Sequence, residues 1–513
     1  MSCPLNQPAG NTRTDPRALL LVAIAALLGA ATVYSPLVAS PHFGDDLLFV
    51  LPDKPVNPLE LLSSPSPTGH YRPLETMAHA WSQHFFGLNP VPVHLVTLGA
   101  HVMVAALCGA FTYVVTRRTF IGVAAALYMA AAQANVIAAG SLDTLSQVLS
   151  ALFGYLSLLL VTTFLGLGEA TDRQRTVRPS LILAGALLSL ALALLSKETG
   201  FGFAIADLVI VLVVFWRRRN RGAPSALSMA GCLAAVIVVA AVYLVVRAQV
   251  ASFQPSTGLD KLSFRLGGNV PANLALLAFS TALPVSSVSI YEAARNSGYA
   301  VAGAGALLAL VVAAAVVGGL HARMGKYGAL AFAICAVAIV LPVALLNHVS
   351  ELYAYVLTPL VAVGLALAVW KFGPELSGRR ALVPLLFAAA LVMNATAAYQ
   401  KASQLDATAR LADRMLDDLA EAAKPAAPGT RIILIDRGSE AFSYSVFKMS
   451  GFELISSGDG YMPPEQVAYL IGRPDMGIIL VGERDLSKLQ GQPGDLRLTL
   501  DSSDRLKTFS EAR

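Results

Sequence analysis

Residues 16–46 read PRALLLVAIAALLGAATVYSPLVASPHFGDD, an apolar run followed closely by two adjacent carboxylates. The run from about residue 18 to residue 38 has the length of about 20 residues that a helix needs to cross the hydrocarbon core of a membrane. It is too long for the core of a signal peptide and lacks a clear cleavage site, so we expect a retained span. Asp45 and Asp46 would then lie directly beyond that span, at the membrane boundary.

The same apolar pattern recurs through residues 18–398, which we expect to form one transmembrane domain. The chain has 513 residues, of which 56% are hydrophobic and 13% are charged. That composition is typical of a polytopic α-helical membrane protein and excludes an ordinary soluble domain. The pattern predicts about eleven spans, near 18–38, 91–115, 119–139, 145–167, 180–195, 201–216, 226–246, 300–319, 327–347, 353–370 and 381–398.

Basic residues in the short connections indicate the orientation. Arginines gather in alternate connections, at 13–17, 117–118, 173–178 and 217–221. Cytoplasmic loops carry such an excess, so we expect a cytoplasmic tail at 1–17 and outer loops at 39–90 and 247–299. The apolar segment 270–290 is interrupted by prolines and hydroxyl residues, and we interpret it as a re-entrant or interfacial helix. The net charge of +5 is modest and lies in these loops, so we expect no nucleic-acid partner.

Residues 399–513 have a soluble composition and predict a small extracytoplasmic α/β domain. The stretch 401–424 has a helical pattern, while 431–436 and 476–481 are typical of short buried strands. We also expect helices near 441–450 and 464–472.

The charged residues at membrane level gather on one predicted face, which is a functional-site hypothesis because charge in a bilayer is costly. Adjacent carboxylates such as Asp45 and Asp46 can supply a general base, since one can be desolvated while the other stays ionised. A helix cap or a solvated loop pair is the structural alternative. Arg72, next to Tyr71, carries a fork of donors suited to phosphate, although it could simply pair with Glu75.

Three more groups belong to this face. Lys197 and Glu198 close the fifth span and Arg247 ends the seventh, although a boundary lysine can merely extend its charge to water. Glu351 and Tyr355 are four residues apart, so a helix would present them on one face. Histidines raise the question of a divalent metal, but their spacing matches no ligand motif, and no cofactor is assigned; they are His70, His79, His84, His94 and His348.

Four blocks together resemble a known superfamily: Asp45–Asp46, YRPL at 71–74, LSKE at 195–198 and SELYAYVLTP at 350–359. In this order they resemble the GT-C superfamily of polyprenyl-phosphate-sugar-dependent glycosyltransferases. The likeness is strongest to transmembrane O-mannosyltransferases with tetratricopeptide repeats, and it covers about 18–370. The chain departs from that pattern because it lacks the repeats. It also has Leu352 and Ala354 where the family has Arg and Leu.

The resemblance implies a GT-C-like fold and inverting sugar transfer from a polyprenyl-phosphate sugar donor to an acceptor hydroxyl of a protein or glycan. Asp45 or Asp46 would be the base, and Arg72, Lys197 and Arg247 would bind the donor phosphate. Supporting or acceptor-side roles fall to four residues, with Glu198 holding Lys197 in place: Tyr71, Glu198, Glu351 and Tyr355. Besides donor and acceptor, membrane lipids are expected partners. The composition suggests a bacterial inner membrane, with the site and the C-terminal domain on the periplasmic or extracellular side.

Other functions compete with this interpretation. A polysaccharide polymerase or ligase of the cell envelope shares lipid-linked donors and large outer loops. A transporter or flippase needs paired halves and ionisable groups near the midplane, whereas the charges here lie at helix ends. A scaffold that presents the C-terminal domain would need no catalytic group.

Overall fold

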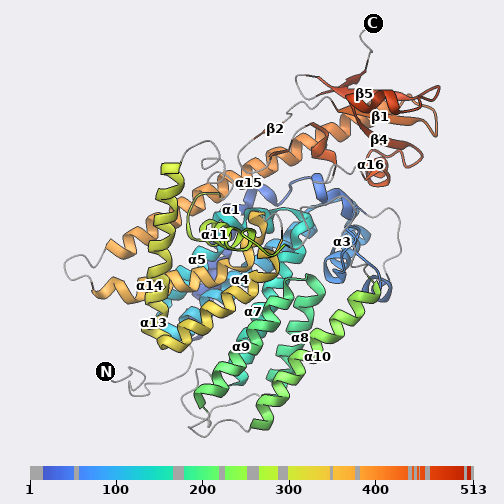
Figure 1. The fold of residues 1–513 in the computed structure, drawn as a ribbon. Coiled ribbons are helices and arrows are strands. Elements are labelled where there is room, and N and C mark those ends of the chain that lie inside the picture. The colour runs from blue at the N-terminus through green and yellow to red at the C-terminus, as the bar shows by residue number, and fades with distance from the viewer. Residues whose placement is uncertain are drawn as a thin grey trace.

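The structure is a computed structural model that describes most of the chain, as a helical bundle with a small sheet at one end (Figure 1). The described residues are 15–50, 57–165, 178–218, 226–250, 265–286, 299–346, 350–375, 382–436, 442–443, 448–449, 451–456, 463–501 and 505–509.

Long apolar helices dominate the described residues. Seven are long and apolar enough to cross a membrane: α1 (Pro16–Tyr34), α4 (Val91–Thr116), α7 (Leu145–Phe164), α8 (Pro179–Ser196), α10 (Ala226–Val250), α13 (Tyr299–Ala344) and α15 (Leu382–Ala423). An eighth span is formed if α5 (Thr119–Ala131) is joined across a 46° bend to η4 (Gln133–Asn135) and α6 (Val136–Gly140). Two shorter apolar helices are α9 (Gly200–Arg218) and α14 (Thr358–Glu375). The architecture is that of a polytopic α-helical membrane protein.

Helix α13 contains two of the predicted spans, 300–319 and 327–347. Its helical geometry is broken at Gly325, where φ is 71°, and the two halves change direction there. Glycine adopts that conformation without the steric cost that a side chain would add. Counting these halves separately, together with the two short helices and the bent pair, reaches the eleven apolar helices that the sequence predicts.

One end of the bundle, which we call the loop end, carries the short elements between the helices. These are η2 (Ser35–Leu37), η3 (Gly44–Phe49), α2 (Pro58–Leu62), α3 (Pro73–Phe86), η5 (Leu142–Thr144), α11 (Asn269–Ala282) and η8 (Glu351–Val356). Helix α11 has 14 residues, about 21 Å at 1.5 Å per residue, and is therefore too short to span a membrane. The predicted span at 353–370 begins later than expected, because η8 precedes α14.

The C-terminal sheet has the strand order β4-β1-β5-β6, with bounds β4 (Gly477–Gly482), β1 (Arg431–Asp436), β5 (Leu496–Leu500) and β6 (Leu506–Thr508). β1 is parallel to both β4 and β5, while β6 is antiparallel to β5. The predictions of β1, β4 and helix α16 (Pro464–Leu470) are confirmed. The predicted helix near 441–450 is wrong: the described residues there form β2 (Phe442–Ser443) and β3 (Lys448–Met449), which pair as antiparallel strands.

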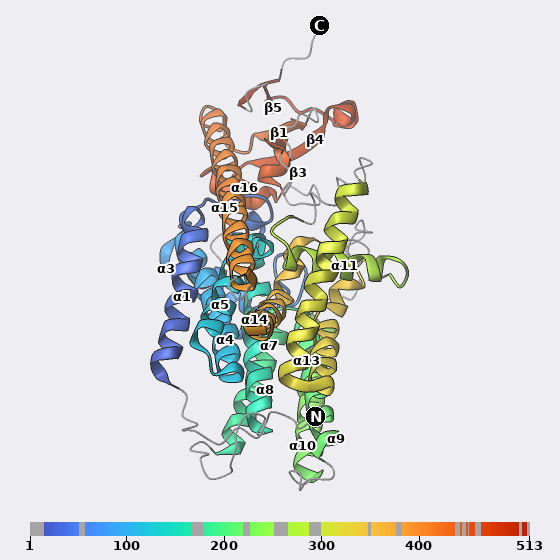
Figure 2. The same cartoon turned by 90° about the vertical axis from the view of Figure 1, so that its left-hand side faces the viewer.

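The C-terminal domain is continuous with the bundle. Helix α15 runs without a break through the boundary expected at 398/399 and leads directly to the sheet (Figures 1 and 2). η9 (Gly451–Ile455) and α16 pack against η3, so the sheet domain touches the segment that carries Asp45 and Asp46. A single apolar core includes Tyr34 of α1, Leu405 of α15 and Leu434 of β1. The candidate site therefore lies under the C-terminal domain.

Candidate active site

Asp46 is buried at the loop end, and its carboxylate is fixed from the segment before α7. Phe43 is extended and Gly44 has φ 56°, a turn that leads the chain from α1 into η3. Asp46 Oδ1 accepts the backbone N–H of Asp143 at 2.8 Å and lies 3.2 Å from Ser141 Oγ. Ser141 Oγ also donates to Asp143 Oδ1 at 2.6 Å. Burial, and then the charge of Asp143, raise the pKa of Asp46 well above its ordinary value.

Asp45, the neighbouring carboxylate, is only partly buried. Its charge acts on the phenol of Tyr353 in η8: burial raises the pKa of Tyr353, Arg72 opposes that shift, and the charges of Glu198, Asp143 and Asp45 add to it. The two acids therefore differ in environment. Asp46 is enclosed, which favours its protonated form, while Asp45 is partly exposed.

Glu198 lies between two arginines and a histidine. Its carboxylate oxygens lie 3.4 Å from Arg72 Nη2, 3.5 Å from Arg247 Nη2 and 3.9 Å from His70 Nδ1. Burial alone would raise the pKa of Glu198, but the charges of Arg72, His70 and Arg247 outweigh it and lower the pKa to about 2. Glu198 is therefore ionised and holds the two arginines.

Lys197 follows α8 and is buried, with 5% of its surface exposed. Its ammonium lies 5.3 Å from the ring centroid of Tyr353, a cation–π contact. Among the described residues, no carboxylate lies within 4.0 Å of Lys197 Nζ and no group hydrogen-bonds to it. Burial, followed by the charge of Arg72, lowers the pKa of Lys197 to about 8, against the opposing charges of Glu75 and Glu198.

The expectation that Glu198 holds Lys197 in place is not met in the described structure, because Glu198 pairs with the arginines. The backbone explains this difference. Lys197 has φ −160° and ψ 155°, an extended conformation, and in extended chain successive side chains point to opposite sides.

Arg72 and Glu75 connect the charged residues around Glu198 to α7. Glu75 Oε1 accepts the N–H of Ser146 at 2.9 Å, in the first turn of α7, where a negative charge is favourable. Arg72 Nη1 lies 3.9 Å from Glu75 Oε2, and its Nε is buried without a hydrogen-bond partner. Burial raises the pKa of Glu75 to about 7, although Arg72 and Lys197 oppose the shift.

The supporting residues lie in different surroundings. The Tyr71 hydroxyl donates to the Leu62 carbonyl at 2.9 Å and fixes the loop between α2 and α3. Glu351 and Tyr355 do not share a helical face, because η8 is a 3₁₀-helix with three residues per turn. Glu351 binds Lys401, whereas the Tyr355 hydroxyl lies 2.9 Å from Nδ1 of His101.

The structure thus brings six predicted residues to one place: Asp45, Asp46, Arg72, Lys197, Glu198 and Arg247. Sequence reasoning missed Ser141, Asp143, Gln133, Tyr353 and Lys401. The signal for the first two was the polar stretch SLDT at 141–144 between two apolar runs. Lys401 gave no signal, because it begins a stretch whose composition looks soluble.

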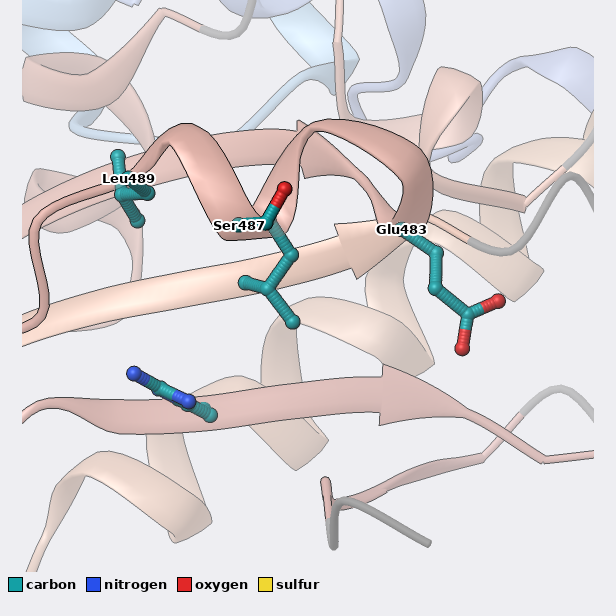
Figure 3. A pocket seen from close by; sticks show the side chains of 5 residues that line it. Glu483, Ser487 and Leu489 are labelled. Atoms are coloured by element: carbon teal, nitrogen blue, oxygen red, sulfur yellow. The ribbon is translucent and has the colours of Figure 1, made fainter.

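The described residues contain no group of three or more His, Cys, Asp or Glu side chains that could hold a metal ion. A hollow of about 420 Å³ lies in the C-terminal domain, between η10 (Glu483–Lys488) and β5 (Figure 3). Glu483, Ser487, Leu489 and Arg497 are among its lining residues. None of the residues placed at the loop end lines it, so we do not assign it to the same site.

No family model matches the sequence, and no curated protein matches it. Solved structures do match the fold. ArnT from Cupriavidus metallidurans aligns with a TM-score of 0.51 in the apo state, at 13% identity over 94% of this chain and 93% of that chain. The same protein bound to undecaprenyl phosphate aligns with a TM-score of 0.50, at 13% identity over 95% and 94%.

The apo oligosaccharyltransferase of Archaeoglobus fulgidus aligns with a TM-score of 0.48 and 14% identity, over 82% of this chain and 62% of that chain. The present chain therefore spans less than two thirds of the archaeal protein. At these identities the comparisons show the fold alone, and with ArnT that fold is GT-C-like over nearly the full length of both chains.

Proposed function

We propose that this membrane protein with a GT-C-like fold is a glycosyltransferase. It transfers a sugar from a polyprenyl-phosphate donor to a hydroxyl group of a protein or glycan acceptor. One observation carries the proposal: the buried Lys197 lies over the ring of Tyr353 without a close acid partner among the described residues, and the partly exposed carboxylate of Asp45 is near enough to that tyrosine to raise its pKa. A base and an anion site at one place are what this transfer requires.

The cations suit a lipid-linked phosphate. Arg72 and Arg247 already share Glu198, so their charges are partly neutralised, whereas Lys197 has no such partner within 4.0 Å among the described residues. Lysine binds phosphate as a compact point charge, and the buried Arg72 Nε offers a further donor. The solved ArnT structure with undecaprenyl phosphate supports a polyprenyl phosphate as the ligand class.

The reaction follows from these positions. Asp45 accepts the proton of the acceptor hydroxyl while its oxygen attacks the anomeric carbon on the face opposite the phosphate. The bond between that carbon and the phosphate oxygen breaks, and its electron pair leaves with the lipid phosphate, so the configuration inverts. Lys197, assisted by Arg72 and Arg247, stabilises the charge that develops on the phosphate, which is usually the largest catalytic contribution.

Asp46 has a different role in this proposal. Enclosed and favouring its protonated form, it accepts from the Ser141 hydroxyl and from the Asp143 N–H and keeps η3 in place. A neutral neighbour also leaves Asp45 free to ionise, because two adjacent carboxylates resist carrying both charges.

We place the loop end on the periplasmic or extracellular side of a bacterial inner membrane, as the arginine-rich connections at the other end favour. The C-terminal domain, packed against η3, would then contact the acceptor.

The test uses a panel of radiolabelled polyprenyl-phosphate sugars and a membrane extract as the source of acceptor. We expect wild type to release sugar from the lipid and Lys197→Met to lose most of that activity. Lys326→Met is the matched control, because Lys326 also lies over a tyrosine ring, at 4.9 Å, but is exposed and remote from Asp45. Equal loss in both variants would contradict a specific anion site at Lys197.

A further inference from the structure

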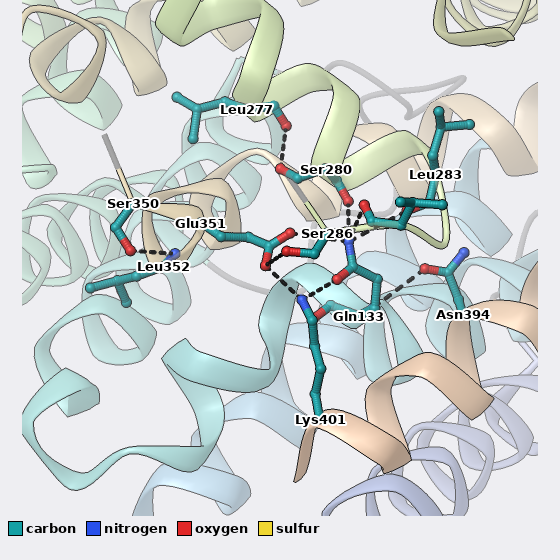
Figure 4. Close-up of polar contacts among 11 residues, drawn as sticks. Gln133, Leu277, Ser280, Leu283, Ser286, Ser350, Glu351, Leu352, Asn394 and Lys401 are labelled. Atoms are coloured by element: carbon teal, nitrogen blue, oxygen red, sulfur yellow. Dashed lines mark hydrogen bonds and ion pairs between the residues drawn. The ribbon is translucent and has the colours of Figure 1, made fainter. Parts of the chain in front are cut away.

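A second buried lysine, Lys401 of α15, has all of its donors engaged. Its Nζ lies 2.6 Å from Glu351 Oε2 and 3.4 Å from the backbone oxygen of Gln133, and it also donates to Gln133 Oε1 (Figure 4). An ammonium group has three protons, so these contacts use its full capacity. Lys401 and Glu351 are 5% and 4% exposed.

Gln133 extends this contact to the end of α11 and to the segment that follows it. Its Nε2 lies 3.0 Å from the Ser280 carbonyl at the end of α11, 3.1 Å from the Val285 carbonyl, and 3.2 Å from Glu351 Oε1. Ser286 Oγ donates to Glu351 Oε2 at 3.2 Å. The ion pair therefore joins α15, η8, the break between α5 and α6, and the end of α11 (Figure 4).

Glu351 is also the first residue of η8, and Tyr353 follows two residues later. The other end of η8 is fixed by the Tyr155 hydroxyl, which donates to the Val356 carbonyl at 2.6 Å. In a helix of six residues held at both ends, release of the first residue changes the position of the ring that follows it. That ring is the group beneath Lys197.

We infer that Lys401 is a positioning residue: its ion pair with Glu351 fixes η8, and η8 holds the Tyr353 ring against Lys197. The inference rests on the proposed function only for what Lys197 binds. Lys401 itself touches no reacting group; it acts through Glu351 and Tyr353.

The test measures how fast an amine-acylating reagent modifies Lys197, with mass spectrometry of the peptide that contains it, at one fixed pH. We expect Lys401→Met to raise the modification rate of Lys197 by about tenfold or more, the scale set by loss of a hydrogen bond to a charged group. Lys424→Met is the matched control, because Lys424 forms an exposed ion pair with Glu421 next to the same helix. We expect it to leave the rate unchanged.

Lys401→Met leaves Glu351 buried without its cation and could prevent folding. The double variant Lys401→Met/Glu351→Gln removes both charges and avoids that cost, and we expect it to keep the raised rate because the ammonium bridge is still missing. A wild-type rate at Lys197 in the folded double variant overturns the inference. A raised rate that Lys424→Met shares also overturns it.

A second readout separates this inference from the proposed function. If both hold, the double variant also raises the KM for the polyprenyl-phosphate sugar, with a smaller change in kcat. If wild type consumes no such donor but the double variant still exposes Lys197, the proposed function fails and the positioning role stands. If donor is consumed and the Lys197 rate is unchanged, only the positioning role fails.

Discussion

The molecule has two buried lysines near η8, and their surroundings differ. Lys401 donates to Glu351 and Gln133 and has no donor left over. Lys197 is equally buried, but no described carboxylate lies within 4.0 Å of it, and Tyr353 offers it only a ring. Lys401 thus has a hydrogen-bond acceptor for each of its N–H groups, whereas the ammonium of Lys197 has no close acceptor among the described residues.

This difference suggests a structural role for Lys401 and a binding role for Lys197. Burying an ammonium costs free energy unless an anion and hydrogen bonds compensate it. At Lys401 the protein supplies the compensation itself. At Lys197 it supplies only the more distant charges of Glu75, Glu198 and Asp143, and the pKa stays lowered, so a bound anion would offset the remaining cost, and we propose that the donor phosphate is that anion.

Asp45 and Asp46 of η3 also differ in role, and their variants should show the largest expected difference in kcat. Asp45→Asn should lower kcat by about 10²–10⁴-fold, the range for loss of a general base. Asp46→Asn should stay within a few-fold of wild type, because an amide can replace a protonated carboxyl between Ser141 and Asp143. Initial rates of sugar release measure both; equal losses would contradict the division of roles.

Loss of Lys401 should mainly affect the stability of the fold. Lys401→Met should lower the free energy of unfolding by about 3–5 kcal/mol, because it leaves Glu351 as an uncompensated buried charge. Thermal unfolding in detergent, followed by circular dichroism, measures the effect. Lys197→Met should leave Tm unchanged or raise it, since a buried charge without a close partner is removed. Equal changes in Tm for Lys401→Met and Lys197→Met would contradict this difference between the two lysines.

Loss of Lys197 should mainly affect turnover. Lys197→Met should raise the activation free energy by about 2–4 kcal/mol, by analogy with a single donor to a developing oxyanion. The loss should appear in kcat/KM for the lipid donor while the protein stays folded. Wild-type kcat/KM would remove Lys197 from the phosphate site.

The same lysine predicts a pH dependence. The pKa of Lys197 is lowered to about 8, so the ammonium is present below that pH and is lost as the pH rises through it. The donor is a phosphodiester and keeps its single charge throughout this range. Donor affinity should therefore fall by about tenfold per pH unit above 8, as one proton is lost per site. Lys197→Arg stays charged and should remove this fall in donor affinity above pH 8. If the fall is unchanged in Lys197→Arg, another group causes it.

Arg247 should give the smallest effect. It is partly exposed and already paired with Glu198 at 3.5 Å, and exposed ion pairs contribute about 1 kcal/mol or less. Arg247→Gln should raise KM for the donor only a few-fold, and added salt should reduce the difference further. A loss as large as that of Lys197→Met would place the phosphate nearer to Arg247.

Much of the fold follows from the sequence because apolar runs of about 20 residues allow few alternatives in a membrane. The loop-end residues also gathered as expected, since each one flanks a span on the same side. The partners of Lys197 and Glu351 could not be predicted. They depend on an extended backbone at Lys197 and a 3₁₀ turn at Glu351, which are set by tertiary packing. β5 was also missed, although its alternating pattern LRLTL is typical of a strand.

The most direct test of the central claim is to incubate the purified protein, Asp45→Asn and Asp46→Asn with radiolabelled polyprenyl-phosphate sugars and an acceptor extract, and to follow release of sugar from lipid. We predict release by wild type and Asp46→Asn and loss of release in Asp45→Asn. Consumption of no donor by wild type would contradict the glycosyltransferase proposal and favour transport, which substrate flux in proteoliposomes would then measure.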